Sequence, residues 1–339
     1  MMKKDIGILL IFVVLCTALA LMNPRFLSAT NLQNTARLIG MFGIFSIGVG
    51  FVIVTGGIDL SSGSLFSFLG VLLCVGLVDF RLPWPLVVAA VLVLGGLLGL
   101  FHGLVVTRLG VQPFIITLCG LLWYRGLANF LADDSTKGFG HCQDFQTLAA
   151  LATGNVLGIP IPFVLLCVIG AMAWVVLHRS VYGRYLLAVG QNEEAARFSG
   201  VNTKRVITSA YVISGGLGAV SAIFFAFYAN AVQPSSHGSF YELFGIAAAV
   251  LGGCSLRGGE GSVVGILIGT ALLQVLKNLV NLLGIRSSLD FAVMGTVIFI
   301  GVVTDEMLKR RKNKRAQSKR QMQEDRARQT ENVRPMESL

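Results

Sequence analysis

Charged residues are scarce in this chain. Only 13% of its 339 residues are Asp, Glu, Lys or Arg, whereas 54% are hydrophobic. A typical soluble domain carries about 25% charged residues. So few charges cannot cover a soluble protein of this size, and the composition therefore predicts an integral membrane protein. The net charge of +10 does not indicate nucleic-acid binding, because eleven of the 27 Lys and Arg residues lie after Thr304, in a terminal tail.

The sequence also lacks the motifs of enzymes and metal sites. Five of the six cysteines lie in or beside apolar runs and only Cys142 lies in a polar loop, so neither a disulfide framework nor a zinc-binding CxxC pair is present. The four histidines stand alone, without an HExxH motif. No glycine-rich stretch reads GxxxxGK[ST], the pattern that cradles nucleotide phosphates. We expect no catalytic residue, metal or cofactor in this chain; if ATP drives it, a separate polypeptide must bind the ATP and Mg²⁺.

Long apolar runs recur along the chain. A hydrocarbon core of ~30 Å is crossed by about 20 apolar residues in a helix. We therefore expect an all-α polytopic membrane domain over residues 1–308, with about ten transmembrane helices, followed by a flexible basic tail at 309–339. The runs are 6–22, 38–55, 65–78, 86–107, 114–131, 161–177, 206–229, 243–256, 263–283 and 289–304. The third, eighth and tenth are short, so either they are broken or re-entrant helices or their boundaries are misplaced.

Two features of the connections set the expected topology. Residues 1–22 resemble a signal peptide but lack a small-x-small cleavage site before Pro24, so we expect a retained first helix. Lys and Arg gather in the connections that share a side with the N-terminus. This bias predicts that both termini and the loop 179–205 are cytoplasmic and that the loop 133–160 is outside.

The inner loop carries the clearest local pattern. Residues 190–200 read as a short helix in which Asn192 is the N-cap, Glu193 and Glu194 complement the helix N-terminus, and Gly200 takes the left-handed C′ position. Such a helix is either a docking element for a cytosolic partner or an interfacial helix on lipid headgroups. Physical reasoning from these residues alone favours neither.

Several polar residues fall in or beside the apolar runs. Asp59 and Ser61 follow two glycines at a break between helices, where they either line a translocation path or cap the next helix. The ninth run carries a polar stripe at spacings i, i+3, i+4 and i+7, which either faces a polar path or places its lysine at the outer headgroups. Arg125 is a further path candidate or an interfacial anchor, whereas Ser287 and Asp290 predict a capping box. The stripe consists of Gln274, Lys277, Asn278 and Asn281.

Four blocks of the sequence match a known family. Residues 194–200 (EAARFSG) resemble the EAA loop of ABC importer permeases, and the preceding 181–190 (VYGRYLLAVG) resembles the same region of ribose-type monosaccharide permeases. Three more blocks resemble that family in the expected order: 55–61 (TGGIDLS), 112–118 (QPFIITL) followed by Arg125, and 252–262 (GGCSLRGGEGS). Cys254 and the basic tail depart from the family pattern.

The resemblance implies the membrane subunit of an ATP-driven monosaccharide importer in a bacterial inner membrane. It implies three partners: ATP-binding subunits, a periplasmic or lipid-anchored sugar-binding protein, and a second permease copy or homologue. The residues implied to couple to the ATPase are Asn192, Glu193, Glu194, Ala195, Ala196, Arg197 and Gly200, and Phe114 joins the path candidates.

Two other classes of protein were weighed. An ion-gradient-driven secondary transporter should carry several carboxylates in its spans, but only Asp59 and Asp290 are expected there, both at helix ends. A membrane enzyme acting on lipid would need a nucleophile or a metal cluster near one interface, and none is visible. The sequence motifs specify neither the sugar nor whether the permease pairs with itself.

Overall fold

The structure of the chain is a computed structural model. It describes residues 3–140 and 145–284, together with the single residues 289, 292, 295, 296 and 299. Four expected features therefore lie outside the described residues, apart from those single positions. They are the tenth span, the capping box at Ser287 and Asp290, Cys142, and the tail after residue 308.

The described part is all-α, as predicted, with four two-residue strands. Strand β1 pairs antiparallel with β4, with Lys137 opposite Val232, and β2 pairs antiparallel with β3 in a tight hairpin. The helices are α1 (Lys3–Met22), η1 (Pro24–Leu27), α2 (Ala29–Val54), α3 (Ser62–Cys74), η2 (Val75–Asp79), α4 (Trp84–Leu109), α5 (Pro113–Leu131), α6 (Gln146–Thr153), α7 (Ile161–His178), α8 (Val181–Gln191), α9 (Glu193–Phe198), α10 (Thr203–Ala229), α11 (Tyr241–Leu251) and α12 (Val263–Leu282); the strands are β1 (Lys137–Gly138), β2 (Asn155–Val156), β3 (Ile159–Pro160) and β4 (Ala231–Val232).

Each of the first nine expected apolar runs forms a helix. Among the described residues, seven helical segments are long and apolar enough to cross a membrane: α2, α3 continued by η2, α4, α5, α7, α10 and α12. Two shorter apolar helices are Ile6–Met22 within α1 and the eleven-residue α11. The eighth run is therefore short, as expected, whereas the third reaches 18 residues because the π-helical η2 extends α3.

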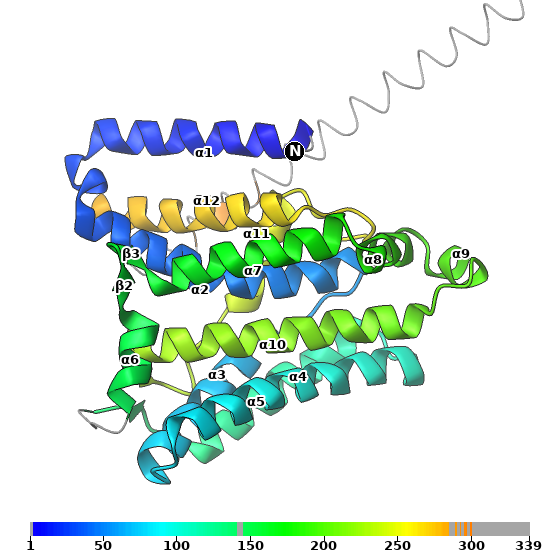
Figure 1. Cartoon of the computed structure of the whole chain (residues 1–339), viewed down its shortest axis with the longest axis horizontal. Coiled ribbons are helices and arrows are strands. Elements are labelled where there is room, and N and C mark those ends of the chain that lie inside the picture. Colours follow the sequence, from blue (N-terminus) through cyan, green and yellow to red (C-terminus); the bar gives the residue numbers. More distant parts are fainter. Residues whose placement is uncertain are drawn as a thin grey trace, which may run out of the picture. The chain divides into compact units, whose positions relative to one another are not determined.

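Burial divides the spanning helices into central and peripheral ones. In the most apolar stretch of α2, 83% of the residues are buried, against 22% in α4 and α5 and 28% in α7. Helix α2 packs against α7, α10, α11 and α12, whereas α4 lies along α10, and α1 lies beside α12 (Figure 1). Apolar side chains remain exposed on α4 and α5, such as Val93, Leu97 and Leu122. A lipid-facing surface requires this distribution, because hydrocarbon solvates apolar side chains as well as a protein core does.

The loops lie at two opposite ends of the helices. Helix α9 projects at one end, whereas α6 and the β2–β3 hairpin lie at the other (Figure 1). The cytoplasmic and outer loops expected from the Lys and Arg bias are thus separated by the length of the helices. Which end faces the cytoplasm stays a prediction.

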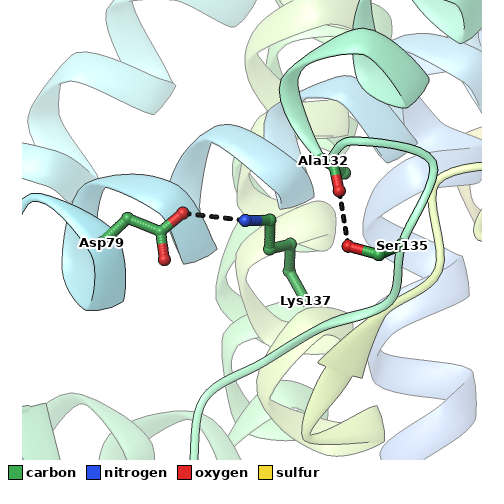
Figure 2. Close-up of polar contacts among 4 residues, drawn as sticks. All are labelled: Asp79, Ala132, Ser135 and Lys137. Atoms are coloured by element: carbon green, nitrogen blue, oxygen red, sulfur yellow. Dashed lines mark hydrogen bonds and ion pairs between the residues drawn. The ribbon is translucent and has the colours of Figure 1, made fainter.

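The segment after α5 is fastened to the end of η2. The Lys137 ammonium lies 3.0 Å from a carboxylate oxygen of Asp79, and the Ser135 hydroxyl donates to the Ala132 carbonyl at 2.6 Å (Figure 2). The hydrogen bond to Asp79 raises the pKa of Lys137 above its usual value. These contacts hold the loop beside β1 and β4.

Candidate functional site

Helix α9 is short and is capped at both ends by its own neighbours. The Asn192 side chain accepts a hydrogen bond from the Ala195 N–H at 2.9 Å, which is the predicted N-cap. Gly200 has φ of +85°, the predicted left-handed conformation, and the Val201 N–H reaches the Ala196 carbonyl at 3.1 Å. Residues 190 and 191 are the last residues of α8, and α9 begins directly after the predicted N-cap Asn192.

The outer surface of α9 is almost entirely free. Ala196 is buried against the rest of the chain, whereas Glu193, Glu194, Ala195 and Arg197 are exposed. Phe198, which was not among the expected coupling residues, is 79% exposed at the end of this helix, with the Arg197 guanidinium 5.7 Å from its ring centroid. An exposed aromatic ring beside charges of both signs is typical of a protein contact surface.

The break before α3 is held by Asp59. Its Oδ1 atom accepts from the Ser61 N–H at 2.9 Å and from the Ser61 hydroxyl at 2.6 Å, and the Ser62 hydroxyl donates to the Asp59 carbonyl at 3.3 Å. Asp59 is only 4% exposed and Ser61 is fully buried. Asp59 therefore satisfies the backbone and hydroxyl donors of Ser61, which is itself the N-cap residue of α3.

A buried relay extends from this break to two other helices. Ser61 Oγ lies 3.2 Å from His102 Nδ1 in α4, and His102 Nε2 lies 3.1 Å from the Tyr124 hydroxyl in α5. In α5, the Thr117 hydroxyl also donates to the Ile58 carbonyl at 3.1 Å. The 56–61 turn is thus tied to α4 and α5. Thr117 lies in the 112–118 block, whereas neither spacing nor motif singled out His102 and Tyr124, which pair only through tertiary packing.

Arg125 holds the loop between α10 and α11. One guanidinium nitrogen, Nη1, donates to the Pro234 and His237 carbonyls, both at 2.7 Å, and the Ser67 hydroxyl of α3 also donates to Pro234 at 3.1 Å. The 230–240 loop therefore folds inward to the middle of α3. The charged Arg125 side chain lies inside an apolar run because it donates to carbonyl oxygens of the loop between α10 and α11, which have no backbone partner within a helix.

Glu242 corrects one expectation of the sequence analysis. The eighth run was expected to begin at residue 243, so no carboxylate was counted there, but α11 begins at Tyr241 and Glu242 lies in its first turn with only 7% exposure. A Cβ atom added at Gly63 of α3 would meet the Glu242 carboxylate, which places that carboxylate against α3. His237 is also buried, and its Nε2 atom has no hydrogen-bond partner.

The polar stripe of α12 faces other helices at two of its four positions. Asn278 and Asn31 of α2 exchange amide hydrogen bonds of 2.7 and 3.2 Å, and Gln274 is 5% exposed with Oε1 unpaired. Lys277 is half-buried and Asn281 is exposed. Among the path candidates outside the stripe, Phe114 at the start of α5 is 51% exposed. The stripe thus packs in part against α2, and its role in a path stays a prediction.

The described part of the chain contains no cluster of three or more His, Cys, Asp or Glu side chains that could hold a metal ion. The two acidic side chains of the interior, Asp59 and Glu242, come from different turns and are not paired with each other. The described interior therefore offers the carboxylates of Asp59 and Glu242, the Arg125 guanidinium, other hydrogen-bonding groups and aromatic rings.

Comparisons with known proteins agree with this architecture. The family described as "Branched-chain amino acid transport system / permease component" matches residues 31–302. The chain is 36% identical over 296 residues to the ribose import permease protein RbsC of Haemophilus influenzae, covering 87% of this chain and 91% of that protein. It is 36% identical over 303 residues to RbsC of Bacillus subtilis, covering 89% and 92%. It is 28% identical over 365 residues to the xylose transport system permease protein XylH of Escherichia coli, covering 89% and 93%. No solved structure matches it.

Proposed function

Because this chain belongs to the family of branched-chain amino acid transport system permease components, we propose that it is the membrane-spanning subunit of an ATP-driven importer of a monosaccharide. The observation that carries the proposal is α9: a capped, projecting helix whose surface is exposed and charged. The sugar class follows from the printed names of its relatives, which are ribose and xylose permeases. ATP hydrolysis belongs to separate subunits.

Helix α9 is the contact to those ATP-binding subunits. Its six residues are too few to form a stable helix alone, since isolated helices below about 12 residues are marginal in water. Glu193 and Glu194 suit a polar protein cleft better than an anionic membrane surface, which repels carboxylates. Phe198 adds an apolar contact of the kind that often dominates binding energy. Movement of the ATPase would then shift α9 and rock the permease between inward-facing and outward-facing states.

The other partners follow from the orientation. With both termini in the cytoplasm, α6 and the β2–β3 hairpin lie outside, where a periplasmic or lipid-anchored sugar-binding protein delivers the sugar (Figure 1). A second permease copy or homologue completes the path. Asp59, Ser61, Phe114, Arg125 and the α12 stripe stay the proposed path residues; the described contacts of Asp59 and Arg125 add a structural role to each.

The test replaces residues of α9 in the assembled transporter. Gly200→Val opposes the left-handed conformation by about 1–2 kcal/mol, and no atom lies within 4 Å of an added Cβ, so the change acts on the backbone alone. Combined with Glu194→Lys, it should abolish uptake and ATPase stimulation by loaded binding protein while the permease still inserts. Gly200→Asn is the matched control, because Asn tolerates this conformation. Normal transport by the double variant would show that α9 is not the coupling element.

Glu242 supports one second candidate, a secondary transporter driven by an ion gradient. It is a buried carboxylate beside the path candidates, the kind of group that proton-coupled transporters use. Proteoliposomes containing the permease alone distinguish the two functions. Sugar uptake driven by a pH gradient without an ATPase would establish the second candidate, whereas uptake that requires the ATPase and ATP would reject it.

A further inference from the structure

Three backbone segments meet near the N-terminal end of α9. They are the turn after α2, the last turn of α8, and the loop between α11 and α12. The Gly259 N–H of that loop donates to the Val54 carbonyl of α2 at 2.9 Å. A Cβ atom added at Gly190 of α8 would meet both of these backbone groups and would lie 3.0 Å from Gly259 Cα. We call this contact among residues 54–56, 190–191 and 258–259 the glycine junction.

At Gly190 and Gly258 the glycine junction brings backbone directly against backbone, whereas the Gln191 side chain lies against Gly259. A Cβ atom added at Gly258 would lie 2.7 Å from the Gly190 carbonyl oxygen and 2.7 Å from the Gly56 nitrogen. Ordinary contacts of a Cβ atom begin near 3.4 Å. The neighbouring atoms are backbone and cannot rotate away as a side-chain tip would. Segments in direct backbone contact have no rotamers to absorb a displacement, so they move together.

The junction joins the two functional regions described above. On one side, α8 is separated from α9 by Asn192 alone. On the other, Gly56 is three residues from Asp59, which organises the start of α3. From Ser61 the relay continues through His102 to Tyr124, and so reaches α4 and α5. Short contacts, together with short stretches of the polypeptide itself, therefore connect α9 to the interior of the helical domain.

We infer that the glycine junction is a rigid transmission point, which passes a displacement of α8 and α9 to the 56–61 turn and to the 252–262 loop. Gly190 and Gly258 are its positioning residues: they touch neither the sugar nor the ATPase, but their lack of a side chain sets the distance between the three segments. The inference rests on the proposed role of α9 and adds the route by which that role acts.

The first test is Gly190→Ala in the complete transporter, with its ATPase and binding protein in proteoliposomes. Gly190 lies within a helix, where alanine is favoured over glycine, so the substitution does not weaken α8 itself. The added Cβ forces the junction apart. We expect uptake and stimulated ATPase activity to fall about tenfold, within the usual range of coupling between sites, while the ATPase subunit still copurifies. Gly96→Ala in α4, where an added Cβ meets nothing within 4 Å, is the matched control.

The outcomes separate this inference from the proposed function. Normal uptake by Gly190→Ala, together with loss of uptake in the α9 variants, would overturn the junction and leave the coupling role of α9 intact. Failure of the unmodified permease to bind any ATPase subunit would instead overturn the proposed function.

A second measurement covers the case in which Gly190→Ala fails to insert. Spin labels at Tyr185 in α8 and Leu256 in the 252–262 loop, both exposed, report the distance across the junction in an otherwise unaltered, cysteine-free permease. A rigid junction keeps this distance unchanged between the nucleotide-free and ATP-bound transporter. A distance that changes between these states would overturn the inference.

Discussion

Arg125 permits a quantitative test of how the interior is held. Its Nη1 atom donates to two carbonyls of the 230–240 loop, at Pro234 and His237. Arg125→Met keeps most of the apolar length of the side chain and removes both donors. The Pro234 carbonyl retains the hydroxyl of Ser67, whereas the His237 carbonyl loses the donor described for it.

The magnitude follows from these contacts. A hydrogen bond from a charged donor contributes about 1.5–3 kcal/mol, and an unsatisfied buried acceptor costs a similar amount. With one of the two carbonyls still bonded, the 230–240 loop should lose about 3 kcal/mol of stability relative to its open form. Each 1.4 kcal/mol is a factor of ten in an equilibrium constant, so the open population should rise roughly 100-fold.

Thiol labelling measures that population. Val232 in β4 is fully buried, and Val232→Cys in a cysteine-free background reacts with a thiol reagent only when the loop opens. We expect labelling about 100-fold faster in Arg125→Met than in the parent. Arg108→Met, which removes an exposed arginine at the end of α4, is the control and should label at the parental rate. Equal labelling rates in Arg125→Met and the parent would refute this role of Arg125.

Three further outcomes are expected. A cysteine at residue 140 should react with an impermeant reagent in intact cells while one at residue 195 stays protected, and the reverse pattern would invert the predicted topology. If the α12 stripe lines the path, Asn278→Leu should reduce uptake with normal assembly; lower thermal stability with normal uptake per assembled transporter would instead assign Asn278 to packing against Asn31. At pH values below 10.5, Lys137→Met should cause a small loss of thermal stability, because the charged amine pairs with Asp79. The difference from the parent should vanish as the pH rises through the raised pKa of Lys137. A difference that does not depend on pH would contradict this.

Features set by neighbouring residues were predictable from the sequence. The N-cap at Asn192 and the left-handed Gly200 depend on residues within a few positions, and both are confirmed. The apolar runs predicted the helices because a helix that crosses a lipid bilayer requires a long stretch of apolar residues. One boundary was wrong: α11 begins at Tyr241 rather than at residue 243.

The interior contacts were not predictable in the same way. His102 and Tyr124 are 22 residues apart on two different helices, and His102 pairs with both Ser61 and Tyr124, so no local pattern connects the three. Arg125 was recognised as unusual, but its partners are backbone carbonyls more than 100 positions away, and any residue type supplies a carbonyl. The sequence therefore showed that a charged side chain at Arg125 is costly inside an apolar run, but it did not show which hydrogen bonds offset that cost.

The amide pair between Asn31 and Asn278 bears on how the protein is made. The two residues are separated by 247 positions, so their contact cannot form until nearly the whole domain has been synthesised. At 5–20 residues per second this delay is roughly 12–50 s. During that time the Asn31 Nδ2 group can still donate to the nearby Phe26 carbonyl, at 2.9 Å in the structure, whereas the Asn31 side-chain oxygen has not yet met the Asn278 amide. A chain that ends before residue 278 therefore keeps the Asn31–Phe26 bond at the start of α2 but lacks the amide pair that fastens α2 to α12.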